Sequence, residues 1–257
     1  MKSTALVTGA SGGIGLELAR RLAGDGHDLA LVARSEGKLH EIGEQLEKAH
    51  GIAATVIAAD LSEPNAAREI VDTLRAASIE IDTLVNNAGF ALHGPFLDND
   101  PRVQRNMLQV NVVALTQLTR LLLPPMVARG SGRILNVAST AAFAPGPLAA
   151  VYSATKSYVL SFSEALAEEL RHSGVTVTAL CPGPTRTGFS AAAGADATRL
   201  YRRQMSSAEV ARVGYEGLNS GRRVVIVGPT NKLLAQSIRI SPRRMVTTIG
   251  RRLWENT

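Results

Sequence analysis

Two side chains that can move a proton lie four residues apart in the segment VYSATKSYVLSFSEALAEEL, residues 151 to 170. The segment has an amphipathic helical pattern, and residues four apart on a helix share a face, so we expect Tyr152 and Lys156 to interact. An ammonium group beside a phenol favours the phenolate, so we expect the pKa of Tyr152 to lie below its usual value of about 10. A tyrosine of this kind can act as a general acid or base near neutral pH.

A glycine-rich segment, TGASGGIG at residues 8 to 15, follows a predicted strand and opens a predicted helix. Gly9, Gly13 and Gly15 permit a tight turn and the close approach of a diphosphate, whose charge the helix N-terminus can hold. Their spacing is GxxxGxG, which differs from the GxGxxG of the commoner dinucleotide fingerprint. The pattern predicts a phosphate-binding turn.

Seven short apolar segments with helical patterns between most of them supply the elements that must position these groups. They are STALVTG, DLALVAR, AATVIAAD, IDTLVNN, GRILNVAS, VTVTALC and RVVIVG. Apolar strands that alternate with amphipathic helices are typical of a parallel sheet covered on both faces. The sequence therefore predicts an α/β fold, a Rossmann-like doubly wound parallel sheet of about seven strands.

The chain of 257 residues is expected to form one domain over residues 1–230, followed by a basic helical extension over 231–257. Residues 188–206 are rich in alanine, glycine and arginine and follow the sixth strand, which makes them a candidate substrate lid. Ser206 and Glu209 have the spacing of a capping box, which predicts the start of a new helix.

Composition excludes several classes of protein. Hydrophobic residues make up 45% of the chain and charged residues 19%, no run of about 18 apolar residues occurs, and Met1 to Ser3 lead into ALVTG without a signal-peptide pattern. We therefore expect a cytoplasmic protein. The one cysteine, Cys181, cannot form an intramolecular disulfide and lies in an apolar segment, so we expect a buried thiol and no metal site.

The net charge of +6 is concentrated near the C-terminus. Eight of the 28 basic residues, but only one of the 22 acidic residues, lie between Gly221 and Thr257. No nucleic-acid recognition motif accompanies them, so we expect no nucleic-acid partner.

Taken together, four motifs in order resemble the short-chain dehydrogenase/reductase family. They are the glycine turn, NNAG at 86 to 89, Ser139 after the fifth strand and YSATK at 152 to 156. The match extends from the first strand to about Thr187.

The resemblance implies a catalytic set of Asn111, Ser139, Tyr152 and Lys156. Hydride transfer to a carbonyl leaves negative charge on oxygen, which needs a proton donor and hydrogen bonds. Tyr152 matches the acid/base, Ser139 the group that holds the substrate oxygen, and Lys156 the residue that also binds the nicotinamide ribose. Asn111 matches an asparagine that positions a water behind the lysine; alternatively, an asparagine within a helix marks a local bend or an internal cap.

The end of the second strand indicates the cofactor. An enzyme that uses NAD is expected to place an acid there, whereas an arginine accommodates a 2′-phosphate. Ala33 occupies the position of the acid, Arg34 follows it and Lys38 can assist, which favours NADP(H). Gly12 stands where many members of the family that use NADP carry a basic residue. With the matches at the later strands, the expected cofactor-binding residues are Gly9, Ser11, Gly12, Gly13, Ile14, Gly15, Arg34, Lys38, Asp60, Leu61, Asn87, Ala88, Gly89, Tyr152, Lys156, Pro182, Gly183 and Thr187.

The substrate is expected to be a small to medium lipophilic ketone or secondary alcohol. Apolar side chains expected around the pocket are Phe90, Leu92, Phe96, Phe143 and Leu148. His93 is expected in a surface loop without a catalytic part.

The C-terminal extension leaves alternatives open. Ser241 and Pro242 predict a helix start, after which Met245, Ile249 and Leu253 share one stripe. Such a basic amphipathic helix could contact an anionic membrane surface, bind an anionic substrate tail, or pack on a partner subunit, of which packing is favoured. Two other functions are a 3-oxoacyl thioester reductase that uses the basic tail and a non-catalytic module that senses NADP. The family also commonly forms homodimers or homotetramers, for which residues 152–172 offer a candidate surface.

Overall fold

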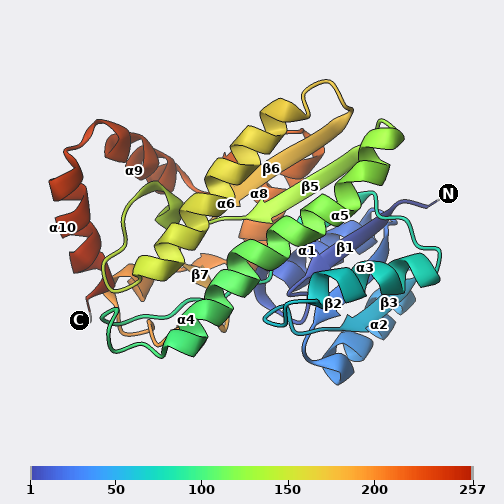
Figure 1. The fold of residues 1–257 in the computed structure, drawn as a ribbon, viewed down its shortest axis with the longest axis horizontal. Coiled ribbons are helices and arrows are strands. Elements are labelled where there is room, and N and C mark those ends of the chain that lie inside the picture. Colours follow the sequence, from blue (N-terminus) through green and yellow to red (C-terminus); the bar gives the residue numbers. More distant parts are fainter. Residues whose placement is uncertain (1, 256–257) are drawn as a thin grey trace.

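The structure, a computed structural model, describes residues 2 to 255. Its main sheet has seven strands, all parallel, in the order β3-β2-β1-β4-β5-β6-β9. The strands are β1 (Thr4–Thr8), β2 (Asp28–Ala33), β3 (Ala54–Ala58), β4 (Thr83–Asn86), β5 (Gly132–Val137), β6 (Val175–Cys181) and β9 (Val224–Ile226). The predicted seven-stranded Rossmann-like fold is confirmed, and each strand lies within one of the seven apolar segments (Figure 1).

Helices cover both faces of the sheet. They are α1 (Gly13–Gly24), α2 (Glu36–His50), α3 (Ala66–Ala76), α4 (Pro101–Leu108), α5 (Leu115–Ala128), α6 (Ala150–Glu169), α7 (Phe189–Ala192), α8 (Ser207–Asn219), α9 (Pro229–Ile240) and α10 (Arg243–Trp254). The π-helix η1 (Gln109–Ala114), the 3-10 helices η2 (Thr140–Phe143) and η3 (Arg199–Arg202), and the strand pair β7 (Thr185–Arg186) and β8 (Met205–Ser206) complete the fold.

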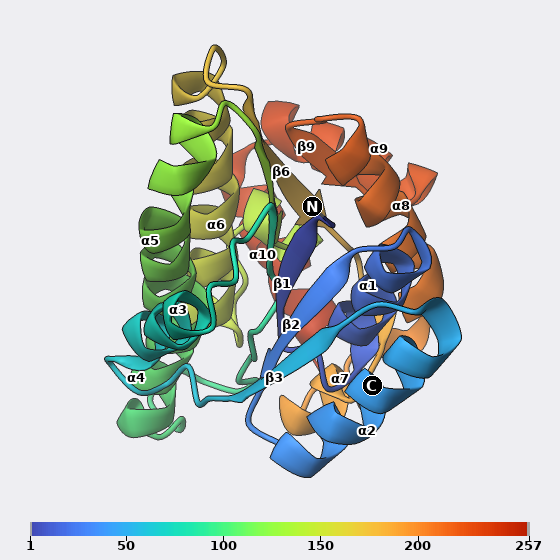
Figure 2. The ribbon, with the colours of Figure 1, turned by 90° about the vertical axis from the view of Figure 1, so that its right-hand side faces the viewer.

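Alternation along the strands builds two hydrophobic cores. In β1, Ala5 and Val7 pack with α1, α2 and α8 on one face, while Leu6 packs with α3, α5 and α6 on the other. Successive side chains of a strand point to opposite faces, so a strand that is apolar throughout is covered on both sides. Figure 2 shows the two helical layers with the sheet between them.

The strand order reverses between β1 and β4, since β2 and β3 lie on one side of this pair and β5, β6 and β9 on the other. In open parallel sheets of this kind, a crevice for ligands forms at the carboxyl ends of the strands beside such a reversal. The loops after β1, β4, β5 and β6 therefore meet where a ligand can bind.

A chain of buried polar side chains crosses the centre of the sheet. The Asn86 amide nitrogen donates to Thr119 Oγ1 (3.1 Å) and to Asn136 Oδ1 (2.9 Å), and Asn136 Nδ2 donates to Ser163 Oγ (2.9 Å). All four side chains are almost completely buried, so their hydrogen bonds replace those to water. The network ties β4 and β5 to α5 and α6, the last of which carries Tyr152 and Lys156.

The continuous helical stretch Pro101–Ala128 is long and apolar enough, by length and composition, to cross a membrane. Core helices of globular domains pass the same test, and this stretch buries Met107, Leu118 and Met126 against the rest of the fold.

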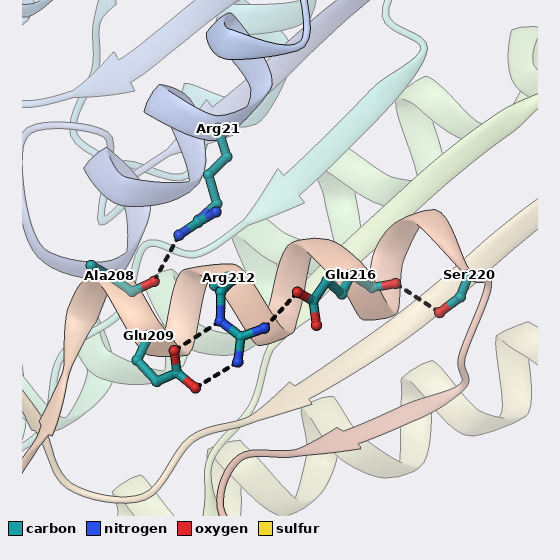
Figure 3. Close-up of polar contacts among 6 residues, drawn as sticks. All are labelled: Arg21, Ala208, Glu209, Arg212, Glu216 and Ser220. Carbon is teal, nitrogen blue, oxygen red and sulfur yellow. Dashed lines mark hydrogen bonds and ion pairs between the residues drawn. The ribbon is translucent and has the colours of Figure 1, made fainter.

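Helix α8 begins where the sequence predicts, with Ser206 at its N-cap, but without the capping box. The Ser206 side chain makes no capping hydrogen bond, and Glu209 instead binds the Arg212 guanidinium with both oxygens, at 2.9 and 2.7 Å (Figure 3). Arg212 also donates to Glu216 at 2.6 Å. A bidentate charged pair is stronger than a bond to a backbone amide, which explains why Glu209 turns away from the N-terminus.

Helices α9 and α10 lie at the end of the molecule opposite the N-terminus (Figure 1). Helix α9 has Pro229 at its first position, and α10 follows Pro242, which occupies its N-cap. The predicted helix start at residues 241 and 242 is thus confirmed to within one residue.

Candidate active site

A cavity of about 630 Å³ opens at the carboxyl ends of the central strands. Gly9 follows β1, Asn87 follows β4, Ser139 follows β5 and Pro182 follows β6, and all four line this cavity. The predicted site residues that line it are Gly9, Ser11, Gly12, Gly13, Ile14, Arg34, Lys38, Asn87, Ala88, Gly89, Ser139, Tyr152, Lys156, Pro182, Gly183 and Thr187. One cavity therefore joins the phosphate-binding turn to the tyrosine and lysine.

Tyr152 lies in the first turn of α6, and its side chain is 6% exposed. Burial raises the pKa of its phenol to about 12, although a hydrogen bond with the Ser139 side chain opposes the shift. The expectation that this pKa lies below its usual value is not met, because loss of water around the buried phenol is the largest contribution to the shift. The phenol is thus a proton donor held in its neutral form.

Lys156 lies one helical turn after Tyr152, and its ammonium nitrogen is 5.9 Å from the centre of the Tyr152 ring. The Nζ atom donates a 2.8 Å hydrogen bond to the carbonyl oxygen of Val137 in β5. The described residues form no ion pair with it, and burial lowers its pKa to about 8. Lys156 is thus a buried cation whose proton is only weakly held.

Asn111 lies within η1, the π-helical turn between α4 and α5, and is almost fully buried. Its amide donates to the Phe90 carbonyl oxygen (2.9 Å) and to Thr155 Oγ1 (3.0 Å), and its Oδ1 atom accepts from the Phe90 backbone amide (3.1 Å). A π-helical turn thus interrupts the regular helix at Asn111, while its predicted role in positioning a water stays a prediction. The same turn brings Asn111 next to α6 and the loop after β4.

Gly89 shows how closely these groups approach. A Cβ atom at this position would lie 3.0 Å from Asn111 Oδ1 and 3.4 Å from Lys156 Nζ. A side chain here would therefore crowd both functional groups. The glycine of NNAG allows the loop after β4 to pass between them.

The glycine turn places the N-terminus of α1 at the cavity. Gly9 has a φ of +66°, and a Cβ atom there would lie 2.7 Å from Asn87 Nδ2, so the turn requires glycine. Helix α1 carries no acidic residue in its first turn, and Gly12, Gly13 and Ile14 line the cavity. Unpaired amides at a helix N-terminus attract anions, so this edge fits a diphosphate.

Two cations mark the far edge of this part of the cavity. Arg34 follows β2 directly and Lys38 lies in the first turns of α2, and both line the cavity. Ala33 ends β2, so no acid stands where a ribose 2′-hydroxyl would need one. The residues present therefore fit a nicotinamide dinucleotide with an added phosphate.

Three predicted cofactor residues do not line the cavity. Gly15 packs inside the turn against Gly9 and Asn87. Asp60 accepts hydrogen bonds from the Ser62 amide (2.9 Å) and hydroxyl (2.8 Å), which help to hold the pKa of its carboxyl below its usual value. Leu61 is buried among the core residues of α3. Their contacts with the cofactor therefore stay a prediction.

The apolar wall of the cavity differs from the prediction. Of the five expected side chains, only Phe90 lines it, while Leu92, Phe96 and Leu148 border one neighbouring hollow and Phe143 another. The residues that sequence reasoning missed come from the segment after β6 and from the C-terminal helices. They are Phe189, Leu200, Tyr201, Leu234, Ile238, Met245, Ile249, Leu253 and Trp254. Of these, the stripe of Met245, Ile249 and Leu253 was visible in the sequence, but its direction was not.

His93 lies in the loop after β4, as predicted, but its ring is partly buried against the end of α10. Its Nε2 atom is 2.6 Å from the carbonyl oxygen of Trp254, and the two rings are stacked with centroids 6.1 Å apart. The Trp254 ring in turn meets the Tyr152 ring edge-on, at 6.3 Å between centroids. His93 thus joins the loop after β4 to the end of α10. Cys181 is buried as predicted, and burial raises the pKa of its thiol to about 12.

The short chain dehydrogenase family model matches residues 3–198. The chain belongs to the short-chain dehydrogenase/reductase family. Members of this family are oxidoreductases that act on carbonyl or alcohol groups and use a nicotinamide cofactor.

Curated relatives share sequence with this short-chain dehydrogenase. The very-long-chain 3-oxoacyl-CoA reductase of Anas platyrhynchos is 37% identical over 193 residues, which cover 72% of this chain and 61% of the relative. This chain spans about three fifths of the length of the curated relatives it matches.

Two solved structures resemble it over almost the whole chain. The short-chain dehydrogenase from Sphingobium yanoikuyae in complex with NADPH has a TM-score of 0.84 and 34% identity, covering 91% of this chain and 92% of that one. The bulky-bulky ketone specific alcohol dehydrogenase from Comamonas testosteroni has a TM-score of 0.79 and 30% identity, covering 92% of each chain.

Proposed function

We propose that this short-chain dehydrogenase uses NADP(H) to interconvert a lipophilic ketone and its secondary alcohol. The observation that carries the proposal is the single cavity, which runs from Arg34 and Lys38, past Tyr152, to an apolar wall. Its polar end fits a phosphorylated dinucleotide and its apolar end fits a hydrocarbon substituent.

The side chains at the middle of the cavity have distinct tasks. When bound, NADPH supplies the hydride for reduction of the carbonyl carbon. Tyr152 gives its phenolic proton to the carbonyl oxygen, and Ser139 hydrogen-bonds the same oxygen as negative charge develops there. Lys156, held by the Val137 carbonyl, supplies positive charge beside the phenol. Asn111 holds the loop after β4 against α6. Its side-chain oxygen and the Lys156 ammonium both lie next to Gly89.

The preference for NADP(H) over NAD(H) rests on charge. Arg34 and Lys38 face the cavity while Ala33 stands where an acid would favour a free 2′-hydroxyl. The relative from Sphingobium yanoikuyae, which is in complex with NADPH, supports the same choice.

A 3-oxoacyl thioester is the second candidate substrate. Several curated relatives are very-long-chain 3-oxoacyl-CoA reductases, and the arginines of α9 and α10 are exposed on helices that border the cavity. Charged phosphates of a coenzyme could bind these arginines while the acyl chain enters the cavity.

The two substrate classes are separated by a direct assay. Purified protein would be mixed with NADPH, and in parallel with NADH, and its oxidation followed with alkyl ketones and with 3-oxoacyl thioesters of matched chain length. We expect turnover with NADPH to exceed turnover with NADH for both classes. If the rate with the ketone equals or exceeds the rate with the thioester, a simple ketone is the better substrate. If the protein turns over the thioester and loses this activity on substitution of Arg239→Ala and Arg243→Ala, the thioester is the substrate.

We further propose a cytoplasmic homodimer or homotetramer that assembles through the long helices. Three large apolar side chains, Leu108, Val113 and Tyr158, are exposed on the α4 to α6 side of the molecule. Apolar groups that gather on one surface favour association. Light scattering would report a mass of at least two chains, and Val113→Asp with Tyr158→Asp would return it to one.

A further inference from the structure

The family match ends at residue 198, whereas the cavity continues into a wall made by α9 and α10. The role of this wall therefore cannot be transferred from the matched region. It has to be inferred from the side chains that the two helices present.

One face of each helix is turned to the cavity. Leu234 and Ile238 of α9, and Met245, Ile249 and Leu253 of α10, all line it. Within each helix these residues are four apart, so they follow one another along a single side. Leu234, Met245 and Ile249 keep 43%, 48% and 46% of their surface accessible, so they border open space and are not packed away. An apolar stripe of this kind can be covered by a hydrocarbon chain.

Arginines are kept off this face. Arg239, Arg243, Arg244 and Arg252 are exposed, and none of the arginines in the described part of α9 and α10 lines the cavity. A substituent that lies along the stripe therefore meets hydrocarbon and no charge, with the Ser237 and Ser241 hydroxyls as its polar neighbours in the cavity lining. A charged substituent placed against the stripe would lose part of its hydration without gaining an ionic partner.

Trp254 fixes the inner end of the stripe beside the reacting group. Its side chain is 5% exposed, and its ring packs edge-on against both Tyr152 and Tyr201, with centroids 6.3 and 6.4 Å away. The Trp254 carbonyl is held by His93, and the next carbonyl, of Glu255, accepts a 3.2 Å hydrogen bond from the Arg199 amide. The end of α10 is thus tied to two other loops at the cavity.

We propose that α9 and α10 form a binding compartment for an extended aliphatic chain of the substrate, with Trp254 setting its inner end next to Tyr152. The proposal deepens the proposed function, on which it rests for the identity of the reacting group. It assigns the preferred substrate to carbonyl compounds or alcohols that carry a long unbranched alkyl substituent.

Binding can be tested without turnover, because Trp254 is the one tryptophan of the chain. Dodecanol and butanol would each be titrated into the protein while tryptophan emission is recorded. We expect a saturable change with dodecanol at far lower concentration than with butanol, since each buried methylene contributes up to about fourfold in affinity. Equal responses to the two alcohols, or none, would overturn the compartment whether or not the protein is an active reductase.

Matched substitutions test where the alkyl chain of the ligand binds. Leu234→Asp and Ile249→Asp place a carboxylate on the stripe, whereas Leu233→Asp and Thr248→Asp place one at neighbouring exposed positions that do not line the cavity. The first pair is expected to weaken dodecanol binding at least tenfold and the second pair to leave it unchanged. Thermal melting would check that all four variants are folded. If one stripe variant fails to fold, the other still gives the test. Equal effects from both pairs would contradict the assignment.

The kinetic test uses methyl ketones of increasing chain length with NADPH. We expect kcat/KM to rise with chain length in the native protein and in Leu233→Asp, and to become flat in Leu234→Asp. A flat series in the native protein would overturn the compartment while leaving the proposed reduction intact. Dodecanol binding without reduction of any ketone would instead sustain the compartment and contradict the proposed function.

Discussion

The Nζ atom of Lys156 donates a 2.8 Å hydrogen bond to the backbone carbonyl of Val137, the last residue of β5. This bond ties α6, which carries Tyr152, to the strand that leads into Ser139. These segments are far apart in the sequence, and the bond holds Lys156 beside the strand that leads into Ser139. It also leaves the ammonium buried with a carbonyl as its hydrogen-bond partner.

The buried ammonium predicts an unusual dependence of stability on pH. The pKa of Lys156 is lowered to about 8, while an unfolded lysine keeps a value near 10.5, so between these values the unfolded chain binds the extra proton. The free energy of unfolding should therefore rise with pH over this window, by about 3 kcal/mol, relative to Lys156→Met. Denaturant unfolding of both proteins at several pH values gives this difference. If the two plots of unfolding free energy against pH stay parallel from pH 8 to 10, burial does not lower the pKa of Lys156.

Charge at the end of β2 should decide between the two nicotinamide cofactors. Arg34→Ala and Lys38→Ala each remove a cation that faces the cavity, so each should weaken NADPH binding by about tenfold or more. NADH binding should change little, because it lacks the phosphate. Lys48→Ala, in the last turn of the same α2 helix, is the matched control. Fluorescence titration of both cofactors measures the effect, and equal losses for NADPH and NADH would contradict it.

The polar network at the centre of the sheet should be important for stability. Asn136→Ala removes the acceptor of the Asn86 amide and the donor to Ser163, both fully enclosed. We expect a loss of about 1 to 3 kcal/mol in the free energy of unfolding, because buried polar groups lose partners. Asn106→Ala, an exposed change in α4, serves as the control. Urea midpoints at constant slope would report the difference, and equal midpoints would refute the role of the network.

Two helix starts should respond differently to the same kind of substitution. The Asp100 side chain accepts a 2.7 Å hydrogen bond from the Arg102 amide at the start of α4, whereas Ser206 makes no such bond at the start of α8. Asp100→Ala should cost about 1 kcal/mol and Ser206→Ala clearly less. Thermal melting of the two variants compares them. A larger loss for Ser206→Ala would mean that α8 is capped in solution after all.

The strands could be predicted because each is a short apolar run between turn residues. A short run that is apolar on both faces fits a strand buried between two layers of helices. The positions of Tyr152, Lys156 and Gly9 could be predicted for a related reason: each lies at a fixed distance from the strand or helix that carries it. Local pattern was sufficient wherever the neighbours in sequence are also the neighbours in space.

The apolar wall could not be predicted, because its members meet only through tertiary packing. His93 and Trp254 are 161 residues apart, and nothing in either segment indicates the other. The stripe of α10 was visible, but a stripe does not state what covers it. The pKa of Tyr152 was missed for a different reason, since its direction depends on how completely the fold removes water from the phenol.

The central claim is that Tyr152 gives the proton to the substrate oxygen, and its most direct test is the rate of NADPH oxidation with a long-chain ketone by Tyr152→Phe. Tyr158→Phe makes the same change on the same helix at a partly exposed ring that does not line the cavity. We expect Tyr152→Phe to lower kcat at least about 100-fold with NADPH binding retained, and Tyr158→Phe to keep the native rate. Equal rates for the native protein and Tyr152→Phe would contradict the account.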